Sequence, residues 1–184
     1  MVSQIKVDSV LESTSAAGVT IDGVLLKDNK LASGTGNVLQ VVNATDESTD
    51  DGNGNYGRQT TETSFQDTGL TATITPSATS SKILVLVQHY PLTYAPGTIP
   101  FGNYQLLRGS TVINTASAGM KADDHPSDNN AYITTPIIFN YLDSPSTTSA
   151  TTYKTQSKYG GTSGGYTWSG YYGVSSMTLI EVGG

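Results

Sequence analysis

The chain has 184 residues, which suits a single domain, and it combines 36% hydrophobic with only 13% charged residues. Its formal net charge of −6 disfavours binding to nucleic acid or to an anionic membrane, and the absence of cysteine excludes disulfides and thiolate zinc sites. With 48 Ser and Thr residues and 20 Gly, the composition favours strands and turns and predicts an all-β protein.

Residues 1–36 form the first predicted unit, a short β arm or stalk. Its apolar residues alternate with polar ones, and no stretch keeps the spacing of a helix. Because so few large apolar side chains cannot form a core alone, we expect the arm to pack on the rest of the chain or on copies of itself, most economically as a threefold stalk. The candidate docking or trimer residues are Ile5, Val7, Val19, Ile21 and Leu25.

The sequence also bears on export and membranes. The N-terminal stretch MVSQIKVDSV lacks the apolar core of a signal peptide. The longest strongly apolar run, residues 83–87, is far shorter than the ~20 residues of a membrane helix. We therefore expect a protein that does not insert into membranes and is not exported by an N-terminal signal.

Residues 37–184 form the second predicted unit, a β-sandwich head of jelly-roll type. The stretch KILVLVQ at 82–88 is expected to be a central strand, and YQLLRGSTVI at 104–113 predicts a hairpin with Gly109 in its turn. The intervals predicted as strands are 37–44, 57–66, 70–75, 82–90, 102–108, 110–116, 131–142, 151–158, 165–173 and 175–182.

Two motif matches fail because their surroundings are wrong. Residues 161–165, GTSGG, match the serine nucleophile elbow, but no helix is predicted after Ser163 and no Asp or His follows it. Residues 52–57, GNGNYG, match a dinucleotide-binding loop, but the acidic residues before them would repel phosphate and a strand is predicted to follow. The sequence therefore predicts neither a serine hydrolase nor a nucleotide site.

Metal-like and histidine patterns are equally weak. Asp51, Asn53, Asn55 and Glu62 have the spacing of calcium-loop ligands, but Tyr56 stands where the sharp turn requires glycine. The cluster Asp123, Asp124, His125 and Asp128 is better explained as a solvated acidic loop, and His89 as a residue that closes a buried strand with a hydrogen bond. We predict no metal, no cofactor and no enzymatic activity.

The most aromatic stretch is KYGGTSGGYTWSGYYG, residues 158–173. Tyr166 and Trp168 share one face of a strand, and the pattern leaves open whether they fill a core or face outward. Tyr171 and Tyr172 are adjacent and fall on opposite faces, which leaves one of them free to face solvent. A glycine-hinged loop could present such rings to a sugar or a protein. The candidate ligand- or receptor-binding residues are Tyr159, Tyr166, Trp168, Tyr171 and Tyr94.

Several phrases of the chain resemble a known family. They are DTGLTATITPSATSSKILVLVQ (67–88), YQLLRGSTVI (104–113), YLDSPSTTSATTYKTQ (141–156) and SSMTLIEVGG (175–184). They are similar to a recurrent C-terminal head domain of tail-fibre and other virion surface proteins of bacteriophages, notably phages of aquatic bacteria. Residues 5–31 resemble the stalk segment often placed before such heads. The resemblance implies a homotrimeric β-sandwich on the outside of a virion, with no catalytic residues to transfer.

Three functional hypotheses follow. The preferred one is a short tail fibre or knob, made in the host cytoplasm and carried on the virion surface, whose trimer attaches to a host-surface glycan. Its loops at 46–57 and 90–102 are the expected contact tips. The alternative is a capsid decoration or cement protein that clamps the shell at threefold positions, with the arm bound to other virion proteins. A bacterial lectin-like module is the third hypothesis.

Overall fold

The computed structural model describes residues 19–21, 24–27, 30–31, 36–47, 56–97, 100–119, 130–161, 164–171 and 173–184, and its regular elements are all β-strands. The strands are β1 (Val19–Ile21), β2 (Val24–Lys27), β3 (Lys30–Leu31), β4 (Val38–Asp46), β5 (Tyr56–Thr60), β6 (Gln66–Ile74), β7 (Lys82–His89), β8 (Leu92–Pro96), β9 (Phe101–Arg108), β10 (Thr111–Gly119), β11 (Asn130–Ile133), β12 (Ile137–Asp143), β13 (Thr151–Tyr159), β14 (Tyr166–Gly170) and β15 (Ser175–Val182). The all-β prediction is confirmed.

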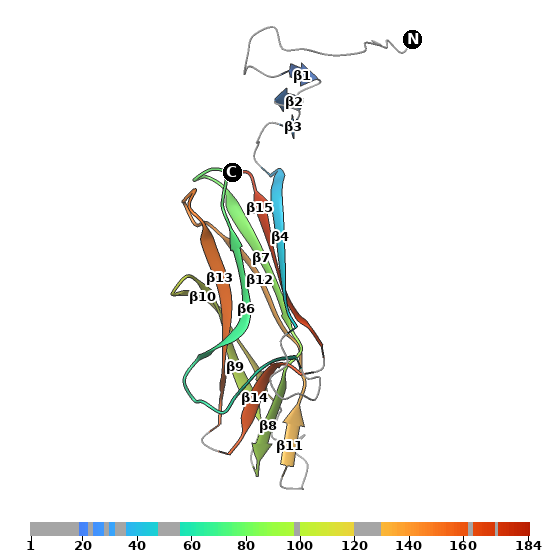
Figure 1. Cartoon of the computed structure of the whole chain (residues 1–184), viewed down its shortest axis with the longest axis vertical. Helices are drawn as coiled ribbons and strands as arrows, with labels where there is room; N and C mark the ends of the chain where they lie inside the picture. The colour runs from blue at the N-terminus through green and yellow to red at the C-terminus, as the bar shows by residue number, and fades with distance from the viewer. Residues whose placement is uncertain are drawn as a thin grey trace, which may run out of the picture.

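The strands from β4 onward form a two-layer sandwich (Figure 1). One layer is the sheet β10-β9-β13-β6. The other layer consists of two sheets with matching orders, β12-β7-β15-β4 and β11-β8-β14-β5. The strands at matching positions of these two sheets are neighbours in the chain: β12 with β11, β7 with β8, β15 with β14, and β4 with β5. Each pair therefore acts as one long strand with an interruption. Eight strand paths in this order have the topology of a jelly roll, as predicted.

The two halves of the interrupted layer lie at opposite ends of the sandwich. The proximal sheet, β12-β7-β15-β4, reaches the end where β4 begins and the C-terminus lies, while β8, β11 and β14 of the distal sheet lie at the other end (Figure 1). At the proximal end the backbone of residues 36–37 is tied to Gly183 by two hydrogen bonds of 2.7 and 2.8 Å. The chain before residue 36 therefore joins the sandwich at the proximal end.

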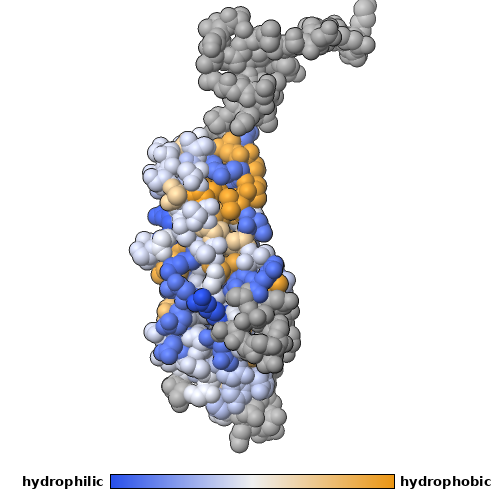
Figure 2. Space-filling model, viewed as in Figure 1, coloured by the Kyte–Doolittle hydropathy of each residue, from blue (hydrophilic) through white to orange (hydrophobic). Residues whose placement is uncertain are grey.

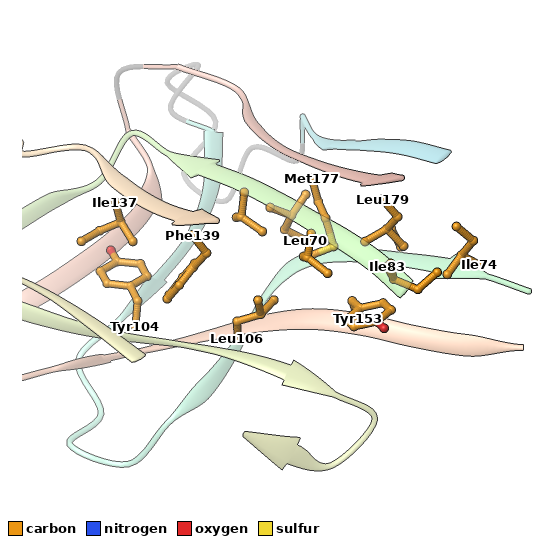
Figure 3. Packing of buried hydrophobic residues seen from close by; sticks show 13 residues of the cluster. Leu70, Ile74, Ile83, Tyr104, Leu106, Ile137, Phe139, Tyr153, Met177 and Leu179 are labelled. Carbon is orange, nitrogen blue, oxygen red and sulfur yellow. The ribbon is translucent and has the colours of Figure 1, made fainter. Parts of the chain in front are cut away.

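The hydrophobic core fills the space between the layers (Figure 3). Its largest buried side chains include Phe139, Leu179 and Met177 from the proximal sheet and Tyr104 and Tyr153 from the opposite layer. The tyrosine hydroxyls are satisfied, because Tyr104 donates to the carbonyl of Trp168 at 3.0 Å and Tyr153 donates to Asp143 at 2.7 Å. Burial holds the pKa values of both phenols above their ordinary range, and the hydrogen bond to Asp143 raises that of Tyr153 further, so both remain neutral donors.

A buried carboxylate fixes the loop at the proximal end. Glu181 on β15 is fully buried and accepts hydrogen bonds from Ser77, Ser81 and Gln40. Burial alone would raise the pKa of Glu181, but these hydrogen bonds lower it to about 2. The ionised carboxylate therefore pins the segment before β7 to the last strand of the chain.

Local sequence signals explain most of the strands. KILVLVQ forms β7, which pairs with β12 on one side and β15 on the other, as expected of a central strand. The predicted hairpin joins β9 to β10 through Gly109, whose φ of 59° favours glycine. The predicted strand at 131–142 is wrong in one respect, because it is interrupted around Pro136 into β11 and β12. The predicted loop at 90–102 is also wrong, since β8 lies within it.

The N-terminal strands form a sheet of their own. β1, β2 and β3 pair in that order, with Val19 opposite Leu26 and Ile21 opposite Val24. Among the described strands they pair only with one another, which agrees with strands in the arm. The boundary between the arm and the head at residue 36 stays a prediction.

Candidate functional site

A row of three tyrosines crosses the distal sheet. Tyr94 on β8 lies opposite Tyr132 on β11 and opposite Tyr166 on β14 in the strand registers. The ring of Tyr94 is 5.0 Å from that of Tyr132 and 5.1 Å from that of Tyr166, with tilts of 38° and 34°. Tyr132 is 51% exposed, and the other two rings are partly exposed. We call these three residues the tyrosine row.

The strand geometry dictates this row. Neighbouring strands lie about 4.8 Å apart, so aromatic residues at matching positions on three strands come into ring contact. The adjacent residues Thr93 and Thr167 point the other way, are fully buried and join their hydroxyls at 3.1 Å. They face Gly102 on β9, where an added Cβ would lie 2.9 Å from the Thr93 hydroxyl. Close packing on the inner side therefore directs the tyrosines to the outer side.

The tyrosine row offers a specific kind of chemistry. Each ring has an apolar face and a hydroxyl, so the row can stack on a sugar ring or an apolar group while it donates and accepts hydrogen bonds. Burial and the neighbouring tyrosines raise the pKa of Tyr166 above its ordinary value, so its hydroxyl is a neutral donor and acceptor. Because the rings already contact one another, little conformational entropy is lost when a ligand binds.

Tyr159 is not presented outward by a glycine-hinged loop, and that expectation is wrong. Tyr159 is 1% exposed at the end of β13. Gly161 and Gly165 press on its ring, since a Cβ on either would collide with the Tyr159 phenol. A Cβ on Gly165 would also collide with the backbone carbonyl of Tyr94. The glycines let the chain fold closely over Tyr159 and beside the tyrosine row.

Trp168 is buried, which decides between the two interpretations that the sequence left open, although by alternation it lies on the same side of β14 as Tyr166 and is not part of the core cluster between the layers. It is 5% exposed, so the outward interpretation is wrong for this residue in the single chain. The ring of Tyr171 meets it edge-on at 6.0 Å, and Tyr171 itself is partly exposed. Tyr172 lies outside the described residues. Of the five predicted binding residues, the structure brings together Tyr94 and Tyr166 on an accessible surface.

Tyr132 is the member of the row that sequence reasoning missed. Tyr132 lies within a predicted strand, so the sequence alone could assign it to one face of that strand. Its partnership with Tyr94 depends on the pairing of β11 with β8, and β8 was predicted as a loop. Without that strand, nothing local connects the two tyrosines.

A polar groove lies on a different side of the distal half. It has a volume of about 600 Å³ and is lined by β5, the segment after it, β6 and β13, including Arg58, Glu62 and Phe65. Asp67 on its wall accepts hydrogen bonds from Lys154 at 3.0 Å and Gln156 at 2.7 Å. Burial opposes ionisation there, yet these bonds hold the pKa of Asp67 below its ordinary value. The groove is polar, and the Asp67 carboxylate in its wall is already paired with Lys154 of the same chain.

His89 is a structural residue at the junction of the two halves. It is fully buried, with Nδ1 2.9 Å from the Ser175 hydroxyl and 3.2 Å from the Ser169 carbonyl, and Nε2 3.0 Å from the Thr155 hydroxyl. Burial lowers its pKa to about 4, partly opposed by the bond with Ser169. The expected hydrogen-bonding role of His89 is confirmed, and its burial keeps substrates away from this His–Ser contact.

Other predicted residues can be placed only in part. Val19, Ile21 and Leu25 fall in β1 and β2. In the described part of the chain no three His, Asp or Glu side chains gather as metal ligands, and no helix there is long and apolar enough to cross a membrane. The residues named by sequence that lie outside the described ones are Ile5, Val7, Asp51, Asn53, Asn55, Asp123, Asp124, His125, Asp128 and Ser163.

Comparisons with known proteins leave the family of this chain open. No protein-family model and no curated protein matches it. Among solved structures, infectious bursal disease virus of the Gx strain is 14% identical over 91% of this chain and 39% of that chain, with a TM-score of 0.40. The insecticidal delta-endotoxin Cry8Ea1 from Bacillus thuringiensis is 15% identical over 70% of this chain and 20% of that chain, with a TM-score of 0.35. The chain thus spans less than half of either protein, and these TM-scores are too low to group it with them.

Proposed function

We propose that this chain is a bacteriophage virion surface protein, a short tail fibre or knob whose distal end attaches the particle to its host. The observation that carries the proposal is the tyrosine row, an accessible aromatic surface at the end of the sandwich opposite the one where the chain enters. A particle that held the protein by its N-terminal arm would present this row outward. The resemblance of residues 67–88, 104–113, 141–156 and 175–184 to phage head domains supports the virion location.

The ligand class that suits the tyrosine row is a surface glycan of the host. Tyrosine rings stack on the apolar faces of sugars, and their hydroxyls match sugar hydroxyls. A row of three partly exposed rings gives a small contact area, so each site binds weakly. A homotrimer, which the resemblance implies, would multiply such contacts through effective concentration. The role proposed is binding without catalysis.

The test is binding of the full chain to a microarray of bacterial surface polysaccharides. Tyr132→Ala and Tyr94→Ala should each reduce the signal at least about tenfold, because each removes a ring that the ligand would contact. Val112→Ala is the matched control, since Val112 is 46% exposed on β10 in the other layer. Wild-type protein that binds no polysaccharide, or variants that bind as well as the wild type, would contradict the proposal.

The location of the protein on intact particles distinguishes attachment from the capsid-decoration alternative. A label on the C-terminus lies at the proximal end, away from the tyrosine row (Figure 1). Electron microscopy of labelled particles should show density at the tail. Density spread over the capsid would favour a cement protein and would make the arm, rather than the distal sheet, the functional site.

A further inference from the structure

The outer side of the proximal sheet carries an apolar surface, which we call the proximal face. The buried residues Ile83, Val85 and Leu179 point into the core, so the residues between them point outward. Read across β12, β7, β15 and β4, the outward rows are Leu142–Leu84–Ile180–Val41, Asn140–Leu86–Thr178–Asn43 and Ile138–Gln88–Ser176–Thr45, with Lys82, Val182 and Val38 at the proximal end.

The aliphatic side chains of the proximal face are unusually exposed. Val38 is 63% exposed, Ile138 58%, and Val41 and Leu142 57% each. Figure 2 shows hydrophobic surface gathered at the end of the sandwich where β4 begins. Within the rows of these four strands, Lys82 is the single charged side chain, and it donates to Ser144 beside the face. Exposed apolar surface with so little charge is characteristic of a contact with another protein.

The face has both a raised part and a hollow. The row from Leu142 to Val41 runs across all four strands as a ridge of aliphatic side chains. Beside it lies a depression of about 250 Å³ whose lining includes Leu86, Ile138 and Thr178. A surface with a ridge next to a hollow can pack against the same surface of another copy, with the ridge of one copy in the hollow of its neighbour.

We propose that the proximal face binds the proximal face of a second copy of this chain. Charge favours a copy over an unlike partner. The chain carries a net charge of −6, so a partner attracted by charge would be basic, yet the outward rows contain no acidic residue, and Glu47 lies just beyond them, where it accepts a hydrogen bond from Thr45. The one charged side chain in the rows, Lys82, lies at the proximal edge and is hydrogen-bonded to Ser144, so two such faces can come together through their apolar rows while most of the negative charge stays outside the contact.

The size of the face indicates how strong this association is. At strand spacings of about 4.8 Å and a rise of about 3.3 Å per residue, the face covers roughly 400 Å² in plan. A standard interface buries about 800 Å² per partner, so this contact is reversible and depends on concentration.

The oligomeric state of the full chain tests this inference. In sedimentation velocity the wild type should exceed the protomer mass of 19.3 kDa increasingly as its concentration rises. Val41→Lys and Leu142→Lys should each raise the dissociation constant about 100-fold or more, because association would bury unpaired ammonium groups. Val112→Lys places the same charge on an equally accessible strand of the other layer and should leave the constant within about threefold.

A milder variant guards against misfolding. Val41→Thr keeps the β-branched shape that suits a strand and should raise the constant about tenfold. A wild type that stays at 19.3 kDa at every concentration would overturn the inference, and so would variants at Val41 and Leu142 that associate as the wild type does. The inference does not rest on glycan binding, because the monomeric Val41→Lys variant retains the tyrosine row and can be tested on the same polysaccharides.

Discussion

The proximal and distal sheets are two halves of one layer with very different outer surfaces. They share strand order, chain connections and an inner side packed on the same opposite layer. The proximal half presents uncharged aliphatic residues such as Val41 and Leu142, while the distal half presents Tyr94, Tyr132 and Tyr166. The backbone therefore fixes where side chains point, and the residue types on the outer rows decide what each half can contact.

The difference separates two tasks along the sandwich. Aliphatic side chains without charge favour a dry contact with a similar surface, whereas tyrosines tolerate water and bind ligands that carry hydroxyls. The first surface belongs to the sheet at the end where the chain enters, and the second belongs to the sheet at the opposite end; Figure 1 shows the positions of the two sheets. A protein held together at one end and exposed at the other suits a role in attachment.

The largest expected effect is a loss of stability on the inner side of the proximal half, compared with a small loss on its outer side. Leu179→Ala should lower the free energy of unfolding by about 3 kcal/mol, because Leu179 is fully buried and its loss leaves a cavity. The neighbouring Ile180→Ala should cost less than about 1 kcal/mol in dilute protein, since Ile180 points outward. Urea denaturation measures both, and equal losses would contradict the assignment of sides.

The junction between the halves should give a pH dependence of similar size. His89 has a pKa of about 4 in the folded chain and about 6.5 when unfolded, so below pH 6.5 the unfolded chain binds more protons. Stability is therefore complete above pH 6.5 and falls by about 3 kcal/mol as the pH drops to about 4. Thermal melting against pH measures this loss.

A matched variant isolates the His89 contribution from that of the carboxylates. His89→Gln should be less stable at pH 7 but should show a flatter profile between pH 4.5 and 6.5. Glu181, with its pKa of about 2, contributes stability that is lost only below about pH 4.5. An unchanged slope in His89→Gln would show that another group controls this window.

An intermediate effect is expected where the glycine-rich segment supports the distal half. Gly165→Ala should lower the free energy of unfolding by about 2 kcal/mol, because its Cβ collides with the Tyr159 ring and the Tyr94 carbonyl. Gly109→Ala serves as the comparison, since open space surrounds Gly109 and only its positive φ is strained, at a cost of about 1 kcal/mol. If Gly165→Ala is neutral, close packing beside the tyrosine row is not required.

The smallest effect on stability is expected for a variant that tests whether the hydroxyls of the tyrosine row take part in binding. Tyr132→Phe keeps the ring and removes the hydroxyl, and it should change the free energy of unfolding by less than about 0.5 kcal/mol. If sugar hydroxyls contact the row, polysaccharide binding should still fall severalfold. Binding equal to that of the wild type would mean that stacking alone carries the interaction.

Much of the fold was predictable because its signals are local. Alternation and β-branched residues predicted β7, and glycine chemistry predicted the turn between β9 and β10. β8 was missed because Pro91 precedes it and Pro96 is its last residue, and prolines resemble loop residues. Pro136 interrupts a pattern that otherwise predicts one strand.

The candidate site was less predictable because it depends on pairing across distant segments. Tyr94 and Tyr166 were selected for their aromatic character, but only the order β11-β8-β14 reveals that they and Tyr132 form a row. Tyr159 is buried because its side of β13 faces the other layer, which alternation alone does not reveal. Trp168 lies on the same side of β14 as Tyr166 but is covered, with the Tyr171 ring edge-on against it. The exposed proximal face was not predicted for the same reason, because alternation does not say which side of its strands faces solvent.

The claim that the two ends of the sandwich have different tasks can be tested with single introduced thiols, because the chain has no cysteine of its own. Val41→Cys on the proximal face and Tyr132→Cys in the tyrosine row each introduce one accessible thiol, and their reaction rates with a maleimide can be compared across protein concentrations. We expect the thiol at 41 to react more slowly as concentration rises, because copies cover it, while the thiol at 132 reacts at a constant rate. Rates that are independent of concentration at both positions would contradict a proximal face buried between copies.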